Sequence, residues 1–598
     1  MLNVLRVHLP SEIPVVGCEI TPYVLILKRP ENSVSSDDVP ESSPVNGCCM
    51  QYRNQNDQKV AVCSVHPTSH ATLQCLACIK YNVAAPKSFH CTPNCFTDAW
   101  QHHRVLHDQA KAAEKYRSVA EESRLNSGGS TSNTGESIGS KTVVDKSGET
   151  WFEIGRSRTY TPTTDDIGHI LKFECTAIDA TSRAPVGNLN TVLTSRVIPA
   201  PSPAPRRMMQ VGFDARGQFD PDGQSAFSGT FSVLSYNILS DVCASKEQHS
   251  YCPSWALSWP YRRQNLLREI IGYRADIVCL QEVQSDHFDE FFGPELEKHG
   301  YDAFYKKETS EVYSGQPNSI NGCATFFRKD KFIFLKKYEF HAQVEFKKAA
   351  NSVIESVVPA TQKKAASHRL AKDNIALIVV LEAKFNSNGS ENSGKRQANT
   401  HINVEEDHVD VKLWQVHTLV KGLEKIAASG DIALLVCGDL NTVPGSVPHV
   451  YLARGKIDHL RPEAVFDPLG VVHPLSKFNH QLPLVSAYSS FLRTVGYNQS
   501  LEQQKRRMDP ATNEPLFTNF TRDFIGTHDY IFYAADRLTV ESLLELLDEE
   551  SLRKDTALPS AEWSSDHIAL LAHFRFTSVM LSMGLKAKPL TPIVFRML

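Results

Sequence analysis

The sequence predicts an α/β fold in which buried strands end in polar side chains. Residues 432–437 are apolar and run into Gly438, which is the pattern of a buried strand in an α/β sheet. Residues 276–281 form a second such strand, and 260–271 and about 411–427 have the apolar spacing of helices. Ligands of such sheets bind just beyond the carboxyl ends of the strands. We therefore expect the functional site where these strands end.

Length and composition favour a multidomain protein inside the cell. At 598 residues the chain is too long for one hydrophobic core. Its net charge of −4 excludes a strongly basic surface, so any nucleic acid would need a local channel. No apolar run approaches the ~18–20 residues that span a membrane, and no secretory leader is evident. We expect no membrane partner, and we expect the 14 cysteines to be thiols or metal ligands.

Close pairs of cysteine and histidine follow a β-rich or partly ordered lead-in at residues 1–60. Thiolates and imidazoles in such pairs, a dozen or so residues apart, are the usual ligands of structural zinc. The pattern predicts a zinc-binding module at 63–107, in preference to scattered buried thiols. Its candidate ligands are Cys63, His66, Cys75, Cys78, Cys91, Cys95, His103 and His107, with His102 as an alternative to His103.

This module resembles the MYND-type finger at the start of eukaryotic methionine aminopeptidases. The resemblance lies in Leu73-Gln-Cys-Leu-Ala-Cys-Ile, in Phe89-His-Cys and in Trp100 before the histidines. It implies a cross-braced module with two Zn²⁺ ions. Cys75, Cys78, His103 and His107 would hold one ion, and Cys63, His66, Cys91 and Cys95 the other. The family usually has two cysteines in place of Cys63 and His66. Such fingers mostly bind proteins, often through short proline-containing peptides.

Linkers and a small β unit are expected before the second half of the chain. The Ser/Gly/Asn/Thr composition predicts a flexible linker within 112–150. Alternating side chains at 172–176 predict a half-buried strand in a small immunoglobulin-like β unit at 151–198. A proline-rich linker at 199–226 then marks a domain boundary.

The second half carries polar residues at the ends of successive predicted strands. Each alone fits a turn or an ordinary buried or surface residue, but the ordered set favours a site for a cation and a phosphate. A carboxylate and an amide oxygen side by side suit a hard cation. The set is Asn237, Glu282, His401, Asp439, Asn441, Asp529, Asp566 and His567.

These motifs resemble the endonuclease–exonuclease–phosphatase superfamily and, within it, the nuclease of the carbon catabolite repressor deadenylases. The resemblance covers about 230–575 and implies a four-layer αββα sandwich, followed by a tail at 577–598. The chain resembles the plant members of these deadenylases in two respects: it carries a zinc-finger pattern ahead of the nuclease region, and its sequence shows no leucine-rich repeats. The motifs are Leu234-Ser-Tyr-Asn-Ile-Leu, Tyr261-Arg-Arg, Leu280-Gln-Glu-Val, Gly438-Asp-Leu-Asn-Thr, Asp529-Tyr-Ile-Phe-Tyr and Ser565-Asp-His.

The resemblance implies phosphodiester hydrolysis with one or, more typically, two Mg²⁺ ions. His567 would activate water while Asp529 fixes its tautomer. His401 would donate to a non-bridging oxygen in the transition state. Phe524 would stack on a terminal adenine, or alternatively pack in the sheet. The expected Mg²⁺ ligands are Glu282, Asn237, Asp439, Asn441 and Asp566, with Asp439 and Asn441 also catalytic.

The expected function is a Mg²⁺-dependent 3′-to-5′ exoribonuclease that shortens mRNA poly(A) tails and releases AMP. The expected partners are poly(A) RNA, a Pop2-like second deadenylase and the carbon-catabolite-repressor–NOT complex. We expect it in the nucleus and cytoplasm, including mRNA-decay granules. One alternative is another phosphodiesterase or phosphatase of the superfamily, although Thr442-Val-Pro-Gly-Ser446 lacks the aromatic and arginine usual in the phosphatases. The other is a scaffold with an impaired nuclease.

One stretch departs from the family pattern. Relatives carry an apolar strand directly before Asn399-Thr-His401, whereas residues 392–398 here are mostly polar. Polar side chains are costly in a buried strand. The sequence therefore predicts that this strand is missing and that His401 is poorly held.

Overall fold

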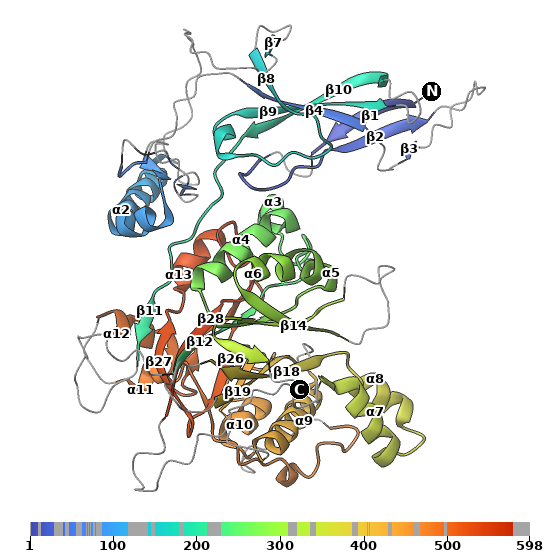
Figure 1. Cartoon of the computed structure of the whole chain (residues 1–598), viewed down its shortest axis with the longest axis vertical. Helices are drawn as coiled ribbons and strands as arrows, with labels where there is room; N and C mark the ends of the chain where they lie inside the picture. The colour runs from blue at the N-terminus through green and yellow to red at the C-terminus, as the bar shows by residue number, and fades with distance from the viewer. Residues whose placement is uncertain are drawn as a thin grey trace. The chain divides into compact units, whose positions relative to one another are not determined.

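The computed structural model divides the chain into two compact units, which Figure 1 shows with their helices and strands. The first unit contains residues 1–205 and 253–264, and the second contains 206–252 and 265–598. The expected tail after Thr577, most of the linker at 112–150 and residues 212–228 lie outside the residues that the structure describes. The described residues are 2–9, 13–28, 40–41, 47–54, 63–66, 69, 71, 73–75, 78, 87–117, 142–144, 150–178, 185–211, 229–308, 320–334, 343–384, 393–402, 405, 407–428, 433–457, 467–494 and 499–577.

Strands from both ends of the first unit share one sheet. β4 pairs with β8 on one side and with β9 on the other. The stretches 1–60 and 151–198, which the sequence separates, therefore form one β unit, because these strands pair across a long insertion that local patterning cannot reveal. The five-stranded sheet has the order β10 (Pro185–Arg196), β9 (Ile170–Ile178), β4 (Gly47–Asn54), β8 (Thr150–Gly155) and β7 (Thr142–Val144), and the three-stranded sheet contains β1 (Leu2–His8), β2 (Tyr23–Lys28) and β3 (Pro40–Glu41).

Apolar side chains from both sheets form the core of this β unit. Leu171 and Phe173 of β9 lie in one cluster with Leu9 and Ile20. Cys175 of β9 is disulfide-bonded, so the prediction that every cysteine is a thiol or a metal ligand was wrong. The pairing of β4 with β9 brings Cys49 opposite Cys175 in the backbone register.

Two seven-stranded sheets form the centre of the second unit. The first sheet has the order β11 (Met208–Gln210), β27 (Leu538–Leu544), β28 (Leu570–Phe576), β12 (Thr230–Asn237), β13 (Ile277–Gln281), β15 (Gly322–Arg328) and β14 (Tyr301–Lys307). The second has the order β16 (Phe332–Phe334), β18 (Ile375–Ala383), β19 (Ser393–His401), β20 (Leu434–Asp439), β26 (Asp529–Ala534) and β21 (Leu484–Ser486), and β17 (Gln343–Glu345) pairs with β18.

The two sheets pack face to face and carry helices on their outer faces. Val233 and Ile277 of the first sheet share a buried core with Leu435 and Ile531 of the second. In Figure 1 the helices α4 (Trp259–Tyr273) and α6 (Gly293–Lys298) lie on the side of the first sheet, and α9 (Val409–Ala427) and α10 (Val447–Arg454) lie beyond the second. This is the predicted four-layer αββα sandwich.

A buried asparagine joins the two sheets by hydrogen bonds. Asn399 of β19 accepts from Gln281 Nε2 of the first sheet at 2.7 Å, and its Nδ2 donates to the carbonyl oxygens of Leu280 at 3.1 Å and Ala324 at 2.9 Å. Buried polar groups stabilise a structure only when they are paired, and this amide has partners for both its oxygen and its nitrogen. The register between the two sheets is therefore fixed at this point.

The strand before His401 is present, so the prediction that it is missing was wrong. β19 runs from Ser393 to His401, and it pairs with β18 from Ser393 to Thr400 and with β20 from Arg396 to His401. Hydrogen bonds from both neighbours satisfy its backbone, which a strand needs regardless of its side chains. Side-chain polarity alone was therefore a poor guide to this position.

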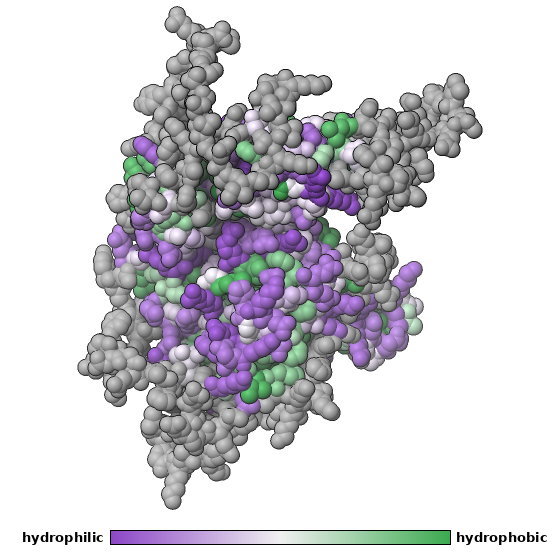
Figure 2. Space-filling model, turned by 45° about the horizontal axis from the view of Figure 1, so that its top comes forward, coloured by the Kyte–Doolittle hydropathy of each residue, from purple (hydrophilic) through white to green (hydrophobic). Residues whose placement is uncertain are grey.

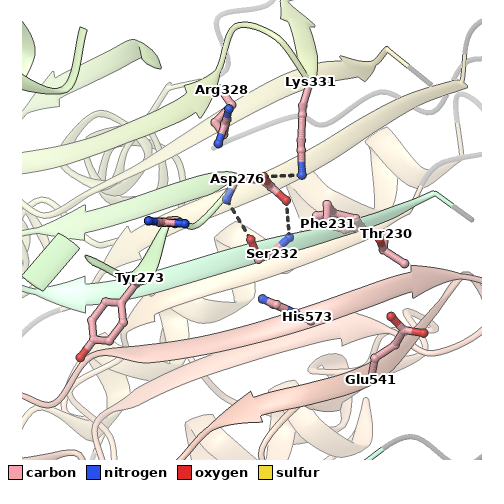
Figure 3. A pocket seen from close by; sticks show the side chains of 10 residues that line it. Thr230, Phe231, Ser232, Tyr273, Asp276, Arg328, Lys331, Glu541 and His573 are labelled. Carbon is pink, nitrogen blue, oxygen red and sulfur yellow. Dashed lines mark hydrogen bonds and ion pairs between the residues drawn. The ribbon is translucent and has the colours of Figure 1, made fainter. Parts of the chain in front are cut away.

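At the opposite end of β12 from Asn237, a pocket of about 280 Å³ opens on the first sheet. Figure 3 shows Asp276 at its centre, between Lys331 and the β12 residue Ser232. The carboxylate of Asp276 accepts from Lys331 Nζ at 2.8 Å and from the Ser232 backbone N–H at 3.0 Å, while its own N–H donates to Ser232 Oγ at 2.9 Å. These contacts fix the starts of β12 and β13 side by side.

One face of the molecule is largely hydrophilic where its residues are described. Figure 2 shows hydrophilic side chains over most of the coloured part of one face, with hydrophobic ones gathered in smaller patches. Within the described part of the chain, no helix has both the length and the apolar character needed to cross a bilayer.

Candidate active site

The polar residues predicted at strand ends meet at one edge of the sandwich. β12 is parallel to β13, and β19 is parallel to β20, so their carboxyl ends point the same way. In the backbone register Asp439 lies opposite His401 on one side and Asp529 on the other. The edge therefore collects side chains from both sheets.

Asn237 bridges carboxylates that come from different sheets. Its Nδ2 donates to Glu282 Oε1 and to Asp439 Oδ2, both at 3.0 Å. Its Oδ1 accepts from the Leu239 backbone N–H at 3.0 Å. Because the donor end of the amide faces the carboxylates, Asn237 holds Glu282 and Asp439 together rather than offering an oxygen between them. The metal-ligand role predicted for Asn237 remains a prediction.

Glu282 is held as a carboxylate. It follows β13 with a positive φ of 56°, and its Oε2 accepts from the Ser240 backbone N–H at 3.0 Å. Burial alone raises the pKa of Glu282, but the His401 ring and the hydrogen bonds from Asn237 and Ser240 outweigh it and lower the pKa overall. A buried, ionised carboxylate is suited to a cation.

Hydrogen bonds fix the turn that contains Asp439 and Asn441. Asn441 has a φ of 44°, and its N–H donates to Asp439 Oδ1 at 2.8 Å. Its Nδ2 donates to the Ile402 carbonyl at 2.9 Å. The amide nitrogen is thus engaged by the neighbouring loop, which leaves the side-chain oxygen to act as a ligand or acceptor.

His567 and Asp529 form the predicted carboxylate–histidine pair. His567 Nδ1 lies 2.7 Å from Asp529 Oδ2, which also accepts from Thr518 Oγ1 at 2.7 Å. The other ring nitrogen, Nε2, lies 3.6 Å from Asp439 Oδ2. Burial lowers the pKa of His567, but Asp529, Asp566 and Asp439 together raise it well above its usual value. The surrounding carboxylates therefore favour the protonated form of the His567 ring.

Glu308 belongs to the same site, although sequence reasoning missed it. Its Oε1 lies 3.8 Å from His401 Nδ1, while His401 Nε2 lies 4.0 Å from Glu282 Oε1 and 3.8 Å from Asp439 Oδ2. Burial raises the pKa of Glu308 to about 6. Glu308 directly follows β14, as Glu282 directly follows β13, and both strands are antiparallel to β15. A carboxylate one residue past a strand end was the signal that could have revealed it.

The site contains buried polar atoms that are suited to a divalent cation. Asp566 Oδ1, Asp529 Oδ1 and His401 Nε2 are buried and have no hydrogen-bond partner among the described residues. Asp439, Asp529 and His567 each place one ligand atom within 4.8 Å of the others. With Glu282, Asn441 and Asp566 nearby, most available donors are oxygens, which hard cations such as Mg²⁺ prefer. The residues present therefore fit a divalent cation.

Comparison with known proteins places this geometry in a family. A match to the Endonuclease/Exonuclease/phosphatase family covers residues 234–567, which includes every residue of the site described above. The chain belongs to this family. It is accordingly an enzyme of the nuclease and phosphodiesterase class, as predicted.

Within the endonuclease/exonuclease/phosphatase family, the chain belongs to the plant carbon catabolite repressor type. It is 62% identical to carbon catabolite repressor protein 4 homolog 1 of Arabidopsis thaliana, over 96% of this chain and 98% of that protein. It is 30% identical to the CCR4-Not complex 3'-5'-exoribonuclease subunit Ccr4 of Saccharomyces cerevisiae, over 63% of this chain and 43% of that protein. The crystal structure of ANGEL2, a 2',3'-cyclic phosphatase, matches 62% of this chain and 99% of its own, with 27% identity and a TM-score of 0.46.

The first unit of this endonuclease/exonuclease/phosphatase protein contains two tetrads of cysteine and histidine. Cys75, Cys78, His103 and His107 form one tetrad and Cys63, His66, Cys91 and Cys95 the other, and in each the ligand atoms lie within 4.8 Å of one another. His103, rather than His102, lies in the first tetrad. His103 and His107 lie on α2 (Pro93–Arg117), and the tetrad joins this helix to the segment after β5 (Leu73–Gln74).

The spacing within each tetrad suits a tetrahedral ion. Cys78 Sγ lies 3.2 Å from Nε2 of both His103 and His107. In the other tetrad Cys63 Sγ lies 3.4 Å from Cys95 Sγ. Zinc bonds of ~2.3 Å to sulfur and ~2.0 Å to nitrogen place tetrahedral ligand atoms roughly 3.3–3.8 Å apart, which is within a few tenths of an ångström of these separations. Both tetrads therefore fit a four-coordinate metal ion.

Phe524 lies beside the catalytic edge with its ring partly exposed. It stacks on His528, with ring centroids 4.4 Å apart and planes at 22°. Gly526 allows this, because a Cβ there would lie 2.7 Å from Phe524 Cζ. Phe524 thus lies outside the sheet core, which leaves it available for stacking.

Gly438→Ala is expected to destabilise the catalytic edge. A Cβ at Gly438 would lie 1.9 Å from the Thr400 carbonyl oxygen, and the residue has a φ of 144°. β19 and β20 would have to separate, which we expect to lower the free energy of unfolding by about 2–4 kcal/mol and to reduce turnover. Denaturant unfolding measures the change. The control is Gly272→Ala in α4, where no atom lies within 4 Å and a gain of about 0.5–1 kcal/mol is expected. Equal stability of the two variants would contradict this account.

Asp529→Asn is expected to lower turnover by about 10²-fold or more and to lower the pKa of His567. The carboxylate that orients the ring and raises its pKa is removed, while the size of the side chain is kept. NMR titration of His567 and single-turnover kinetics measure the two effects. Asp523→Asn is the control, because Asp523 lies in the neighbouring loop, is exposed and pairs only with Arg522 in the described structure. An unchanged His567 titration would show that Asp529 does not control the ring.

Proposed function

We propose that this protein is a Mg²⁺-dependent 3′-to-5′ exoribonuclease that shortens the poly(A) tails of mRNA and releases AMP. The observation that carries the proposal is the cage of oxygens from Glu282, Asp439 and Asn441 beside the His567–Asp529 pair. Such a cage suits a metal-assisted attack on a phosphodiester. The name of the Saccharomyces relative, a 3'-5'-exoribonuclease subunit, supports the direction of cleavage.

Each group in the cage has a role that follows from its contacts. Glu282, Asp439, Asn441 and Asp566 would hold Mg²⁺, and we propose two ions, while Asn237 keeps the side chains of Glu282 and Asp439 in place. A bound ion lowers the pKa of water and offsets charge on the phosphate. His401 Nε2 faces the cage without a hydrogen-bond partner among the described residues and can donate to a non-bridging oxygen.

His567 can transfer a proton at its Nε2, either to the leaving group or from the attacking water. Asp529 holds Nδ1, so only Nε2 faces the site. While His567 carries a proton, its Nε2–H can donate to a phosphate oxygen or to the leaving 3′ oxygen. Once cation charge balances the surrounding carboxylates, the same nitrogen can accept a proton from water, as the sequence predicts.

Apolar side chains near the site favour a nucleic-acid substrate over an inositol polyphosphate. Three large hydrophobic residues are exposed and each closely follows a site residue along the chain: Val242 is 62% exposed, Val443 44% and Ile525 39%. With the stacked Phe524, they offer a surface for unpaired bases. A site for a highly charged sugar phosphate would be lined by cations instead.

The test is incubation of the purified full chain and Mg²⁺ with a 5′-labelled RNA that ends in adenosines. We expect stepwise shortening from the 3′ end with release of AMP, and slower shortening of a tail of cytidines. Cleavage at an internal abasic site, or release of phosphate from an inositol polyphosphate, would favour the alternative enzyme. No hydrolysis of any of these substrates would favour a scaffold.

We also propose that both cysteine–histidine tetrads hold Zn²⁺ and that the module recruits a Pop2-like nuclease of the carbon-catabolite-repressor–NOT complex. Thiolate and imidazole donors in tetrahedral spacing support zinc. The names of the fungal relatives, which are CCR4-Not complex subunits, support the complex. We place the activity in the nucleus and cytoplasm, where mRNA occurs, including decay granules. Imaging of a tagged chain tests this location, and exclusion from both compartments would overturn it.

A further inference from the structure

A buried lysine lies directly beneath the catalytic turn. Lys412 is on α9, the helix that Figure 1 shows beyond the second sheet, and the residue is only 6% exposed. Its Nζ donates to the backbone carbonyl oxygen of Asn441 at 2.6 Å. Lysine is rarely buried to this extent, because the loss of hydration must be offset by hydrogen bonds or nearby charge. Such burial beside a catalytic turn indicates a function for the ammonium group.

The bond to Lys412 completes the set of contacts that fix Asn441. The residue has a left-handed backbone, with a φ of 44°, which costs about 1–3 kcal/mol outside glycine. Its N–H is held by Asp439 Oδ1, its Nδ2 by the Ile402 carbonyl and its C=O by Lys412. The one polar atom left over is Oδ1, the oxygen available to the cage. Removing Lys412 frees the carbonyl and with it the orientation of the whole turn.

The charge of Lys412 also reaches the catalytic edge. Burial lowers the pKa of His528 to about 4, and the charge of Lys412 is among the further causes in the same direction. His528 in turn stacks on Phe524 and accepts from the Leu440 N–H through its carbonyl. Lys412 is thus close to the turn, and its hydrogen bond goes to the backbone carbonyl of Asn441 rather than to the Asn441 side-chain oxygen.

We propose that Lys412 is a positioning residue for phosphodiester hydrolysis. Its ammonium group holds the Asn441 carbonyl, which sets the left-handed turn and directs the Asn441 side-chain oxygen into the cage. This inference rests on the proposed hydrolytic function. It also explains why a charged residue occupies a helix position that the fold alone would fill with an apolar one.

The same helix offers a matched control. Lys421 of α9 also donates to a loop carbonyl, that of Asn479, at 2.9 Å. Its side chain is 40% exposed, and it also pairs with Glu424. Lys421→Met therefore removes an equivalent lysine-to-carbonyl bond from the same helix without touching the catalytic turn.

The experiment is a double-mutant cycle between Lys412→Met and Asn441→Ala. We expect Lys412→Met to lower kcat by about 10- to 100-fold with a small change in KM, and Lys421→Met to change neither. In the Asn441→Ala background, Lys412→Met should have little further effect, because it acts through Asn441. Lys412→Arg, which keeps a charged donor, should recover part of the rate. Additive effects of the two substitutions, or a normal kcat for Lys412→Met, would overturn the inference.

A second variant and a second substrate ensure that the experiment tests the role of Lys412 whatever the first result is. If Lys412→Met does not fold, as judged by its melting temperature, Lys412→Gln takes its place, because its shorter neutral side chain does not reach the carbonyl. The cycle is run on adenosine-tailed RNA and on bis-p-nitrophenyl phosphate, a general phosphodiester. Hydrolysis of the second substrate alone would refute the RNA function while still testing Lys412. A chain inactive on both would overturn both proposals.

Discussion

Glu282→Gln is expected to reduce turnover by about 10³-fold or more with a change in melting temperature within about 3 °C. The carboxylate accepts from Asn237 Nδ2 and from the Ser240 backbone N–H, both at 3.0 Å. Glutamine keeps the shape and one acceptor oxygen but loses the charge that a cation needs. The lost hydrogen bond is offset because two buried carboxylates no longer repel each other.

Metal titration separates this effect from folding. Mg²⁺ should raise the melting temperature of the unmodified chain, because a ligand that binds only the folded state stabilises it by mass action. The same titration should leave Glu282→Gln nearly unchanged. Glu295→Gln is the control, since Glu295 pairs with Lys298 on the surface of α6. Trimming by Glu282→Gln at close to the normal rate would refute the metal assignment.

Cys78→Ala is expected to remove one of the two proposed zinc ions and to unfold the part of the module that this ion holds. Cys78 is fully buried and lies against both His103 and His107. Apparent zinc-binding energies in such modules reach ~10–16 kcal/mol and supply their folding energy, so the three remaining ligands of this tetrad should not hold their part of the module in place. Elemental analysis should fall from two zinc ions per chain to one, and calorimetry should show an early transition.

The catalytic unit should be unaffected by this change, while the partner is lost. Phosphodiester hydrolysis should stay within about twofold of normal, and co-purification with the Pop2-like nuclease should disappear. Cys18→Ala is the control, because Cys18 is a buried free thiol of the same unit outside both tetrads. Retention of two zinc ions by Cys78→Ala would contradict the tetrad, and retention of the partner would assign recruitment to another part of the chain.

The catalytic residues were predictable from the sequence because polar side chains at the ends of apolar runs are a strong signal. Glu282 and Asp439 lie where β13 and β20 end, and Asp529 begins β26, whose antiparallel pairing with β20 brings it opposite Asp439. The grouping of cysteine and histidine into two tetrads was predictable for a similar reason, since the paired spacing restricts which residues can meet. In both cases the residues of the site belong to short local sequence motifs.

The features that the sequence did not reveal depend on distant neighbours. β19 forms because β18 and β20 supply hydrogen bonds on both sides, whatever its side chains. The amide of Asn237 faces two carboxylates of different sheets, and no local pattern shows which end of an amide points where. β4 joins β8 and β9 across the cysteine–histidine insertion. Each of these depends on long-range pairing that periodicity cannot report.

The division of the site between two sheets has a consequence for how the enzyme fails. Asn237 bonds to a carboxylate of each sheet, and Asn399 joins the sheets a short distance away in the core. A partly unfolded chain in which only one sheet remains intact would keep only the site residues of that sheet, and it would not hydrolyse the substrate. Heat inactivation should therefore occur at the same temperature as the loss of contact between the two sheets. The rate of hydrolysis that remains at a given temperature then measures the fraction of molecules in which both sheets are still packed together.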